Sequence, residues 1–298
     1  MENTASPARG SRFSPAKINL FLAVTGLRPD GFHNLVSIVA QCAFGDRLTR
    51  RDADGGAAED SLEVTGTDVP EGAGNLVLRA AAAFRRAEPK LPPQRFKLEK
   101  RIPLGAGLGG GSGNAAAALS LLAERMPGMS ATWLGGIGAG LGSDVPLFLQ
   151  DHAVIMRGRG DRLEDLPESA CDRLSGLPVL LFGPPAAMET PRAYALLRAR
   201  GTYAAPQWAE ERVAAFAEGR LSPEELLFNS FAEVVEDRLP TIAVVLRSVR
   251  EAGIPALMSG SGSACFALPR DDADTETVRG IVAEAWGAGA FFTPTFLL

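Results

Sequence analysis

Residues 103–119 combine a run of glycines with an alanine-rich stretch, which is the composition of an anion-binding site. Six glycines lie between Gly105 and Gly113, and the alanines after them predict a helix. Glycine lets backbone N–H groups turn toward one point and lets a ligand approach closely. The start of a helix adds unpaired N–H groups and the positive end of the helix dipole. We therefore predict a cradle for nucleotide phosphates; the alternative is a turn that only packs a helix against a sheet.

The spacing of these glycines separates the segment from two other phosphate-binding loops. It is not closed by Gly-Lys-Ser/Thr, so it is not a Walker A loop. Gly105, Gly107 and Gly110 fit G-x-G-x-x-G, but a dinucleotide site also needs a βαβ unit and an acidic residue about 20 residues further on. Glu124 lies only loosely in that range, and a helix rather than a strand is predicted after Met126.

Two polar side chains interrupt an apolar segment near the start of the chain. Lys17 and Asn19 are two residues apart, so they share one face of a strand predicted over residues 13–27. A lysine in such a segment is either held by an acid at a site or extends its ammonium to solvent. His33 follows shortly after, in the sequence Gly-Phe-His.

Two later segments carry polar or small residues that could join the same site. Asp144 lies between Gly142 and Pro146, where an aspartate acts either as a functional carboxylate or as a turn-forming or capping residue. Residues 258–266 form a second loop of serines and glycines, where a backbone can approach a ligand or simply turn a tight hairpin.

The pattern along the chain predicts a mixed order of strands and helices, which indicates the α+β class rather than a doubly wound sheet. The predicted strands are 13–27, 35–44, 47–52, 61–66, 94–102, 153–157, 178–182, the two flanks of 256–268, and 291–298. The predicted helices are 75–86 with Asn75 as N-cap, 112–124, 130–140, one that starts with Thr190 as the cap, 207–218, 229–238, 241–252 and 274–286. A domain boundary is expected between residues 161 and 178, which are polar and contain proline.

Composition indicates an enzyme of the reducing cytoplasm. The 298 residues are 46% hydrophobic and 22% charged, and the net charge of −5 without a basic run gives no support for nucleic-acid or anionic-membrane binding. The three scattered cysteines lack zinc-site spacing and are odd in number. Residues 1–12 lack the apolar core of a signal peptide, and the apolar run 20–24 is too short to span a bilayer.

Taken in order, these segments resemble the GHMP small-molecule kinase family. Pro-Ala-Lys-Ile-Asn from Pro15, Asp-Gly-Phe-His ending at His33, and Gly-Ser-Asp-Val-Pro from Gly142 resemble the branch that phosphorylates 4-diphosphocytidyl-2-C-methyl-D-erythritol in the non-mevalonate isoprenoid pathway. The resemblance covers residues 14–268, except for an excursion that follows Tyr194, and residues 259–266 resemble the C-terminal glycine motif of the family. It implies an α+β fold with an N-terminal ribosomal-protein-S5-like domain and a C-terminal ferredoxin-like domain. We expect a disordered leader over 1–12, the ATP-binding domain over 13–165 and the substrate domain over 166–298.

The resemblance also implies roles for individual residues. Lys17 and Asp144 match a catalytic pair in which the carboxylate is the general base and the ammonium offsets charge on the transferred phosphoryl group. The residues implied to hold ATP are Pro103, Leu104, Gly105, Ala106, Gly107, Leu108, Gly109, Gly110, Gly111, Ser112 and Gly113 around the phosphates, with Asn75 and Lys100 near the adenosine. Those implied to contact the cytidylyl substrate are Asn19, Phe32, His33, Thr190, Tyr194, Gly260, Ser261 and Gly262. ATP and Mg²⁺ are the implied cofactors, and the metal ligands stay open, with Ser112 as one candidate.

Three positions depart from the family pattern. Phe32 and Gly113 stand where tyrosine and serine are usual, and Asp161 stands where glutamate is expected. The missing hydroxyl at Gly113 leaves Ser112 as the residue that could take over its role near the phosphates or the metal. Two other functions remain open: a different kinase of this family, such as a homoserine kinase, or a nucleotide-binding regulator without turnover. The expected partner is a small molecule, and the oligomeric state is left open.

Overall fold

The computed structural model describes residues 10–53, 58–67, 69, 71–126 and 128–298. The leader expected over residues 1–12 therefore lies mostly outside the described residues, and the first strand begins at Ser11. The described chain divides into two compact units that interleave along the sequence. Unit 1 contains residues 10–16, Gly45–Ile102 and Gly109–Gln150, and unit 2 contains Lys17–Phe44, Pro103–Leu108 and Asp151–Leu298. The boundary expected between 161 and 178 stays a prediction.

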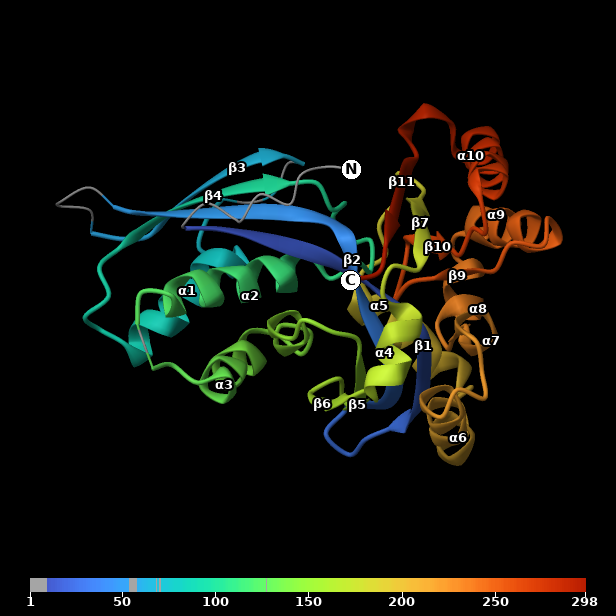
Figure 1. The fold of residues 1–298 in the computed structure, drawn as a ribbon, viewed down its shortest axis with the longest axis horizontal. Coiled ribbons are helices and arrows are strands. Elements are labelled where there is room, and N and C mark those ends of the chain that lie inside the picture. Colours follow the sequence, from blue (N-terminus) through green and yellow to red (C-terminus); the bar gives the residue numbers. More distant parts are fainter. Residues whose placement is uncertain (1–9, 54–57, 68, 70, 127) are drawn as a thin grey trace. The chain divides into compact units, whose positions relative to one another are not determined.

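Unit 1 is a sheet covered by helices (Figure 1). Its strands run in the order β3-β4-β2-β1, with β2 and β4 antiparallel and β3 and β4 parallel. The strands are β1 (Ser11–Leu27), β2 (His33–Asp52), β3 (Ser61–Gly66) and β4 (Gln94–Lys100), of which β1 and β2 continue into unit 2. The helices are α1 (Leu76–Ala87), α2 (Gly110–Ala123), α3 (Ala131–Leu141) and the short 3₁₀ helix η1 (Pro146–Leu149).

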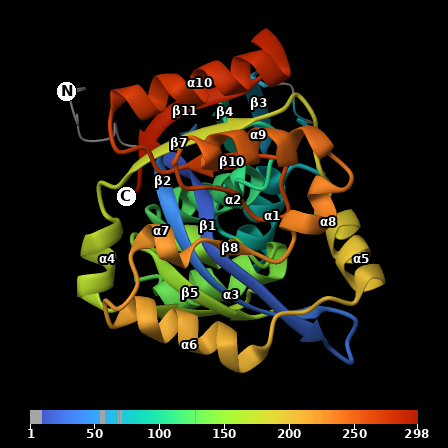
Figure 2. The ribbon, with the colours of Figure 1, turned by 90° about the vertical axis from the view of Figure 1, so that its right-hand side faces the viewer.

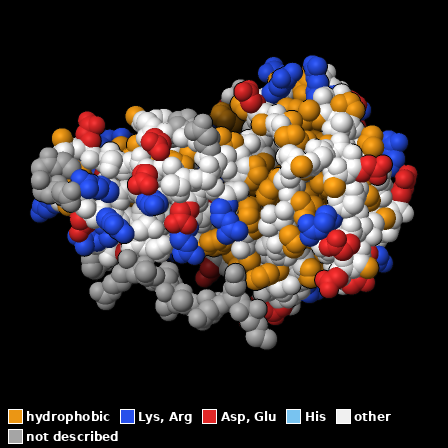
Figure 3. Space-filling model, turned by 90° about the horizontal axis from the view of Figure 1, so that it is seen from above, with side chains coloured by type: hydrophobic (Ala, Val, Ile, Leu, Met, Phe, Trp, Pro, Cys, Tyr) orange, Lys and Arg blue, Asp and Glu red, His pale blue; other side chains and the backbone are white. Residues whose placement is uncertain are grey.

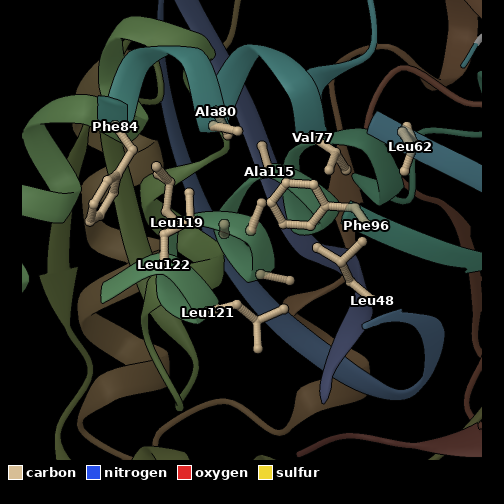
Figure 4. Packing of buried hydrophobic residues seen from close by; sticks show 14 of the residues in the cluster. Leu48, Leu62, Val77, Ala80, Phe84, Phe96, Ala115, Leu119, Leu121 and Leu122 are labelled. Atoms are coloured by element: carbon tan, nitrogen blue, oxygen red, sulfur yellow. The ribbon is translucent and has the colours of Figure 1, made fainter. Parts of the chain in front are cut away.

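The core of unit 1 lies between the sheet and helices α1 and α2 (Figure 4). Helix α1 buries Val77, Ala80 and Phe84, whose spacing of three and four residues places them on one face. Helix α2 is buried on most sides, and its alanines allow α1 to approach closely. This packing fixes the N-terminus of α2, where the glycine-rich segment ends.

Unit 2 contains the other ends of β1 and β2 and a second sheet. In the first sheet the order is β6-β5-β2-β1-β8, with β5 (Val154–Gly158), β6 (Arg162–Asp165) and β8 (Phe228–Asn229). The second sheet is antiparallel in the order β11-β7-β10-β9, formed by β7 (Pro178–Gly183), β9 (Ala256–Met258), β10 (Cys265–Ala267) and β11 (Phe291–Phe296). The helices of unit 2 are α4 (Glu168–Leu174), α5 (Thr190–Arg200), α6 (Pro206–Ala217), α7 (Pro223–Leu226), α8 (Ala232–Glu236), α9 (Pro240–Glu251), α10 (Asp272–Trp286) and η2 (Gly287–Gly289).

Helices α9 and α10 pack against each other and against the second sheet, as both views show (Figures 1 and 2). Two helices on an antiparallel sheet are what the ferredoxin-like expectation requires. The predicted α+β class is confirmed by this arrangement together with that of unit 1.

Most predicted elements are present, and the differences have local causes. The strands predicted over 35–44 and 47–52 are one strand, β2, which continues through Gly45 and Asp46. A Cβ on Gly45 would lie 2.3 Å from the backbone oxygen of Ser14, so the close approach of β1 requires glycine there. Thr190 is the first residue of α5 rather than its cap, which is Glu189. Strands β6 and β8 and helices α4 and α7 were not predicted, since all four are short.

Acidic and basic side chains are interspersed on the face shown in Figure 3. Within the described residues, no helix has the length and apolar character needed to cross a bilayer.

Candidate active site

The N-terminus of α2 in unit 1 rests on a buried ion pair. The ammonium of Lys100 bonds the carboxylate of Asp46, and the two side chains are 3% and 0% exposed. Asp46 also accepts hydrogen bonds from the backbone N–H groups of Arg101 (2.7 Å) and Ile102 (2.8 Å) and from the amide of Asn114 (2.8 Å). Burial lowers the pKa of Lys100, and the neighbouring Asp46 opposes that shift.

This ion pair lies directly beneath the first turn of the helix. A Cβ on Gly110 would lie 2.7 Å from the Nζ atom of Lys100, so only glycine fits above the ammonium. Gly109 caps the helix in the left-handed conformation (φ 74°), and α2 has no side-chain cap. The first N–H groups of α2 therefore lack helical or side-chain acceptors and are available to an anion.

The glycine at position 113 has a steric reason. A Cβ there would lie 2.8 Å from the hydroxyl oxygen of Ser14 and 3.2 Å from the backbone oxygen of Pro15. The Ser14 hydroxyl in turn accepts a hydrogen bond from the amide of Asn114 at 2.9 Å. The buried Ser14 hydroxyl of β1 thus lies close to the position that a serine side chain at residue 113 would occupy.

Asp144 lies in the short connection between α3 and η1, beside the start of α2. A Cβ on Gly142 would lie 4.0 Å from the hydroxyl oxygen of Ser112, and η1 packs on α2. This places the segment that carries Asp144 at the N-terminal part of α2. Asn75 caps α1 by accepting a hydrogen bond from the N–H of Val77 at 2.9 Å. Unit 1 therefore brings together Ser112 and the segment that carries Asp144.

In unit 2, Lys17 and Asn19 lie side by side on β1, as predicted. The Lys17 ammonium donates to the Asn19 amide oxygen at 2.6 Å, and the Asn19 amide donates to the Ser37 hydroxyl at 2.9 Å. The Ser37 hydroxyl donates to the backbone oxygen of Phe21. This chain of bonds fixes a buried ammonium on a central strand.

Two glycine loops meet next to Lys17. A Cβ on Gly260 would lie 3.1 Å from the Lys17 Nζ atom and 3.0 Å from the backbone oxygen of Gly107. A Cβ on Gly107 would lie 2.5 Å from the backbone oxygen of Ser259. Both glycines have positive φ, 56° at Gly260 and 78° at Gly107. The loop of residues 258–266 therefore lies next to Lys17 and to the first part of the glycine-rich segment, and its part in a site stays a prediction.

Backbone hydrogen bonds hold the first part of the glycine-rich segment. The N–H groups of Met188, Ala264 and Lys17 donate to the backbone oxygens of Gly105 (3.3 Å), Ala106 (3.0 Å) and Leu108 (3.0 Å). Residues 103–108 are therefore tied on several sides within unit 2, although they contain no regular element. These bonds fix the backbone of the segment in one conformation.

Asn229 holds the second glycine loop. Its amide nitrogen donates to the backbone oxygens of Met258 (2.7 Å) and Gly260 (2.8 Å), and its amide oxygen accepts from the N–H of Phe231 (2.9 Å). A further bond joins the hydroxyls of Thr190 and Ser261 at 2.9 Å, so the first turn of α5 is tied to the same loop. Thr190, Ser261 and Gly260 are therefore neighbours, as expected.

His33 lies among aromatic rings in unit 2. The Tyr194 ring stacks on the imidazole at a centroid distance of 4.9 Å, and Phe231 packs edge-on against Tyr194 at 4.8 Å. The Tyr203 ring lies 5.8 Å from the imidazole, and its hydroxyl is 3.4 Å from Nε2. Burial, with a smaller contribution from the charge of Arg198, lowers the pKa of His33 below its ordinary value, so the ring is neutral at pH 7.

Phe32 has an environment different from that of its neighbour. Its side chain is 51% exposed, and the guanidinium of Arg159 lies over its ring at 5.2 Å. Asp161 bonds Arg159 at 3.1 Å, which gives that aspartate a local role in the β5–β6 turn. The exposed ring of Phe32 remains available for stacking.

Sequence reasoning missed three residues of this arrangement: Asp46, Asn229 and Tyr203. Asp46 had a signal, because it follows a glycine inside an apolar strand. Tyr203 had one as well: the chain has only two tyrosines, and both pack on His33. Asn229 was expected to begin a helix over 229–238 but lies in β8, and its local pattern gave no sign of its contact with the second glycine loop.

Comparison with known proteins gives consistent matches. The family model for the GHMP kinases N terminal domain matches residues 75–151, and that for the GHMP kinases C terminal part matches residues 213–288. A 4-diphosphocytidyl-2-C-methyl-D-erythritol kinase from Deinococcus radiodurans is 36% identical, with 95% of this chain and 92% of that protein covered. One from Caulobacter vibrioides is 38% identical, with 90% and 92% covered.

Solved structures agree with these matches. A crystal structure of 4-(cytidine 5'-diphospho)-2C-methyl-D-erythritol kinase is similar with a TM-score of 0.74 and 33% identity, covering 96% of this chain and 99% of the other. A homoserine kinase from Cytophaga hutchinsonii is similar with a TM-score of 0.72 over 100% and 97% of the two chains. Its identity of 16% shows a shared fold only.

Proposed function

The chain belongs to the GHMP kinases and, within them, to the 4-diphosphocytidyl-2-C-methyl-D-erythritol kinases, and we propose on that premise that it phosphorylates this compound. The γ-phosphate of ATP would move to the 2-hydroxyl, giving the 2-phosphate and ADP for isoprenoid synthesis. The observation that carries the proposal is identity of 36–38% over at least 90% of the chain to relatives of that name. The homoserine kinase alternative has only a likeness of fold behind it.

The phosphates of ATP are assigned to residues 103–113. The open N–H groups of the first turn of α2 and the positive end of its dipole supply the attraction. Asn75 and Lys100 are proposed near the adenosine. Lys100 is also needed to pair with Asp46, so a contact with the nucleotide is a second role for that side chain.

Asp144 is proposed as the general base. It takes the proton of the 2-hydroxyl as that oxygen bonds to the γ-phosphorus, and the bond from phosphorus to the bridging oxygen breaks to release ADP. Lys17 is proposed to offset negative charge on the phosphoryl group as it moves. Its bond to Asn19 and the narrow space above it at Gly260 support a fixed position for that ammonium.

Mg²⁺ is proposed as a counter-charge. The described residues include no group of three or more His, Cys, Asp or Glu side chains suited to a metal. Such a group is not required, because Mg²⁺ in kinases uses one or two protein oxygens together with substrate phosphates. The Ser112 hydroxyl at the start of α2 is an oxygen that fits the role. When bound, the ion would neutralise phosphate charge.

The cytidylyl group is assigned to the aromatic residues of unit 2. A neutral His33 can both donate and accept a hydrogen bond and can therefore read the polar edge of cytosine. Tyr194 and Phe32 supply rings for stacking, which is worth about 1–3 kcal/mol per base. Asn19, Thr190 and the loop from Gly260 to Gly262 are proposed to contact the rest of the substrate.

Release of ADP with different acceptors tests this function. We expect turnover with 4-diphosphocytidyl-2-C-methyl-D-erythritol, none with homoserine, and inhibition by CMP that is competitive with the acceptor. Turnover with homoserine and no effect of CMP would favour another kinase of the family. ATP binding without turnover on either alcohol would favour a regulator.

A further inference from the structure

Tyr203 has no role in the function described above, yet the fold places it on His33. Helix α5 ends at Arg200, and its C-cap Gly201 adopts the left-handed conformation (φ 71°), which turns the chain back. The N–H of Ala204 then donates to the backbone oxygen of Val24 on β1 at 2.9 Å. Tyr203 lies between Gly201 and Ala204, so the backbone on both sides of it is fixed.

The contact between the two rings uses one nitrogen of the imidazole. The Tyr203 hydroxyl is 3.4 Å from Nε2 of His33, and the Tyr194 ring covers one face of the imidazole. Across the described residues, Nδ1 of His33 has no hydrogen-bond partner. One ring nitrogen is thus occupied by the protein, and the other is left for a ligand.

The chemistry of the pair decides where the proton resides. A neutral imidazole carries one N–H and one acceptor nitrogen, and the hydrogen bond at one nitrogen sets the state of the other. A phenol that donates to Nε2 makes it the acceptor and leaves the proton on Nδ1. Cytosine presents two acceptors, N3 and O2, on its polar edge, which an Nδ1–H group can meet.

We propose that Tyr203 is a positioning residue for substrate recognition: its hydroxyl holds Nε2 of His33, so that the Nδ1–H group faces the cytosine. The proposal rests on the proposed function of His33. Tyr203 itself need not touch the substrate. Its effect is to keep the imidazole in one orientation and one tautomer.

The first test needs no substrate. The chain has only two histidines, His33 and His152, so ¹⁵N NMR of the imidazoles resolves both, and His152 serves as an internal control. We expect Tyr203→Phe to shift the Nε2 and Nδ1 signals of His33 and to leave those of His152 unchanged. Unchanged His33 signals would overturn the proposal, whatever the enzyme phosphorylates.

The second test adds ligand and turnover. CMP should shift the Nδ1 signal of His33 in the wild type more than the Nε2 signal. Tyr203→Phe should raise the KM for the cytidylyl substrate roughly 3- to 10-fold, the range for one lost hydrogen bond, with kcat and the KM for ATP unchanged. Thr202→Val, which removes an exposed hydroxyl from the neighbouring residue, is the matched control and should change neither KM.

A double-mutant cycle separates positioning from a direct contact. In a His33→Ala background, Tyr203→Phe should have no further effect on the substrate KM. Additive effects would overturn the proposal, because they would mean that Tyr203 acts independently of His33. A third outcome is that Tyr203→Phe alters the His33 signals but the wild type neither binds nor phosphorylates cytidylyl compounds. In that case the proposed function is wrong, and the hydrogen bond between Tyr203 and His33 is still supported.

Discussion

The two glycine segments of this protein, 109–113 and 259–262, look alike in sequence but are built differently. The first is the start of helix α2 and lies over the buried ion pair of Lys100 and Asp46. The second contains no helix, and it is held by the neutral amide of Asn229. Both use a glycine of positive φ, 74° at Gly109 and 56° at Gly260.

The difference shows where each segment obtains its positive charge. Above the ion pair the two charges compensate each other, so attraction for an anion comes from the N–H groups and dipole of α2. The second segment does not begin a helix, and the positive charge next to it is the Lys17 side chain beside Gly260. A backbone site suits bound phosphates, and a side-chain ammonium suits charge that develops during transfer.

The largest effect is expected from Asp144→Asn, beside the first segment. It should lower kcat by about 10²–10⁴ and leave ATP affinity nearly unchanged, because backbone groups and not this carboxylate hold the phosphates. Steady-state kinetics and ATP titration measure both quantities. Asp151→Asn, at a fully exposed carboxylate, is the control. A variant that keeps most of its rate would remove Asp144 as the base.

Lys100→Met tests the support under α2. It leaves the Asp46 carboxylate buried without its cation, which should reduce the free energy of unfolding by about 3–5 kcal/mol. Chemical denaturation measures this loss. If the KM for ATP also rises in protein that is still folded, Lys100 contacts the nucleotide as well. An unchanged stability would contradict the structural role.

Asn229→Ala is the counterpart at the second segment. It removes the donor to the backbone oxygens of Met258 and Gly260 and the acceptor for the N–H of Phe231. We expect a loss of about 1–3 kcal/mol in the free energy of unfolding, less than at Lys100, because the groups left without partners are neutral. A loss as large as that of Lys100→Met would mean that the two supports do not differ.

Gly260→Ala and Gly253→Ala form a matched pair. Both glycines have positive φ, so alanine is strained by about 1–2 kcal/mol at either position. Only at Gly260 would the new Cβ press on Lys17, at 3.1 Å, whereas Gly253 has open space. We expect both variants to lose stability and only Gly260→Ala to lose activity, by roughly 10-fold in kcat. Equal kcat values for the two variants would mean that the loop around Gly260 does not take part in catalysis.

The smallest effect is a pH dependence from His33. Burial and Arg198 lower its pKa, so the ring gains its proton at a lower pH than a histidine of ordinary pKa, 6.5. The KM for the cytidylyl substrate should therefore rise as the pH falls, with the midpoint of the rise below pH 6.5. Arg198→Gln should raise the pKa and move the onset to higher pH. His152→Gln is the control, and a profile unaffected by Arg198→Gln would contradict this assignment.

Much of the secondary structure could be predicted from the sequence, because residues close together in the chain determine where helices and strands begin and which of their faces are buried. Asn75 marks the start of α1, and alternating residues mark β4. The continuity of β2 through Gly45 was not predicted, and the glycine there serves a close contact with Ser14, far away in sequence. Contacts of this kind leave no local pattern.

The same limit applies to the site. Lys17 and Asn19 could be placed together because a strand repeats every two residues. The bonds from Asn229 to Met258 and from Tyr203 to His33 span 29 and 170 residues, and no spacing rule reaches so far. The role of Lys100 under α2 was likewise hidden, because its partner Asp46 comes from another strand.

The central claim is transfer of a phosphoryl group to a cytidylyl alcohol, and ³¹P NMR of the reaction mixture tests it most directly. With ATP and 4-diphosphocytidyl-2-C-methyl-D-erythritol we predict a new phosphomonoester signal that grows in step with ADP, and its near absence with Asp144→Asn. Formation of ADP and inorganic phosphate alone, or the same new signal at the same rate from Asp144→Asn, would contradict the account.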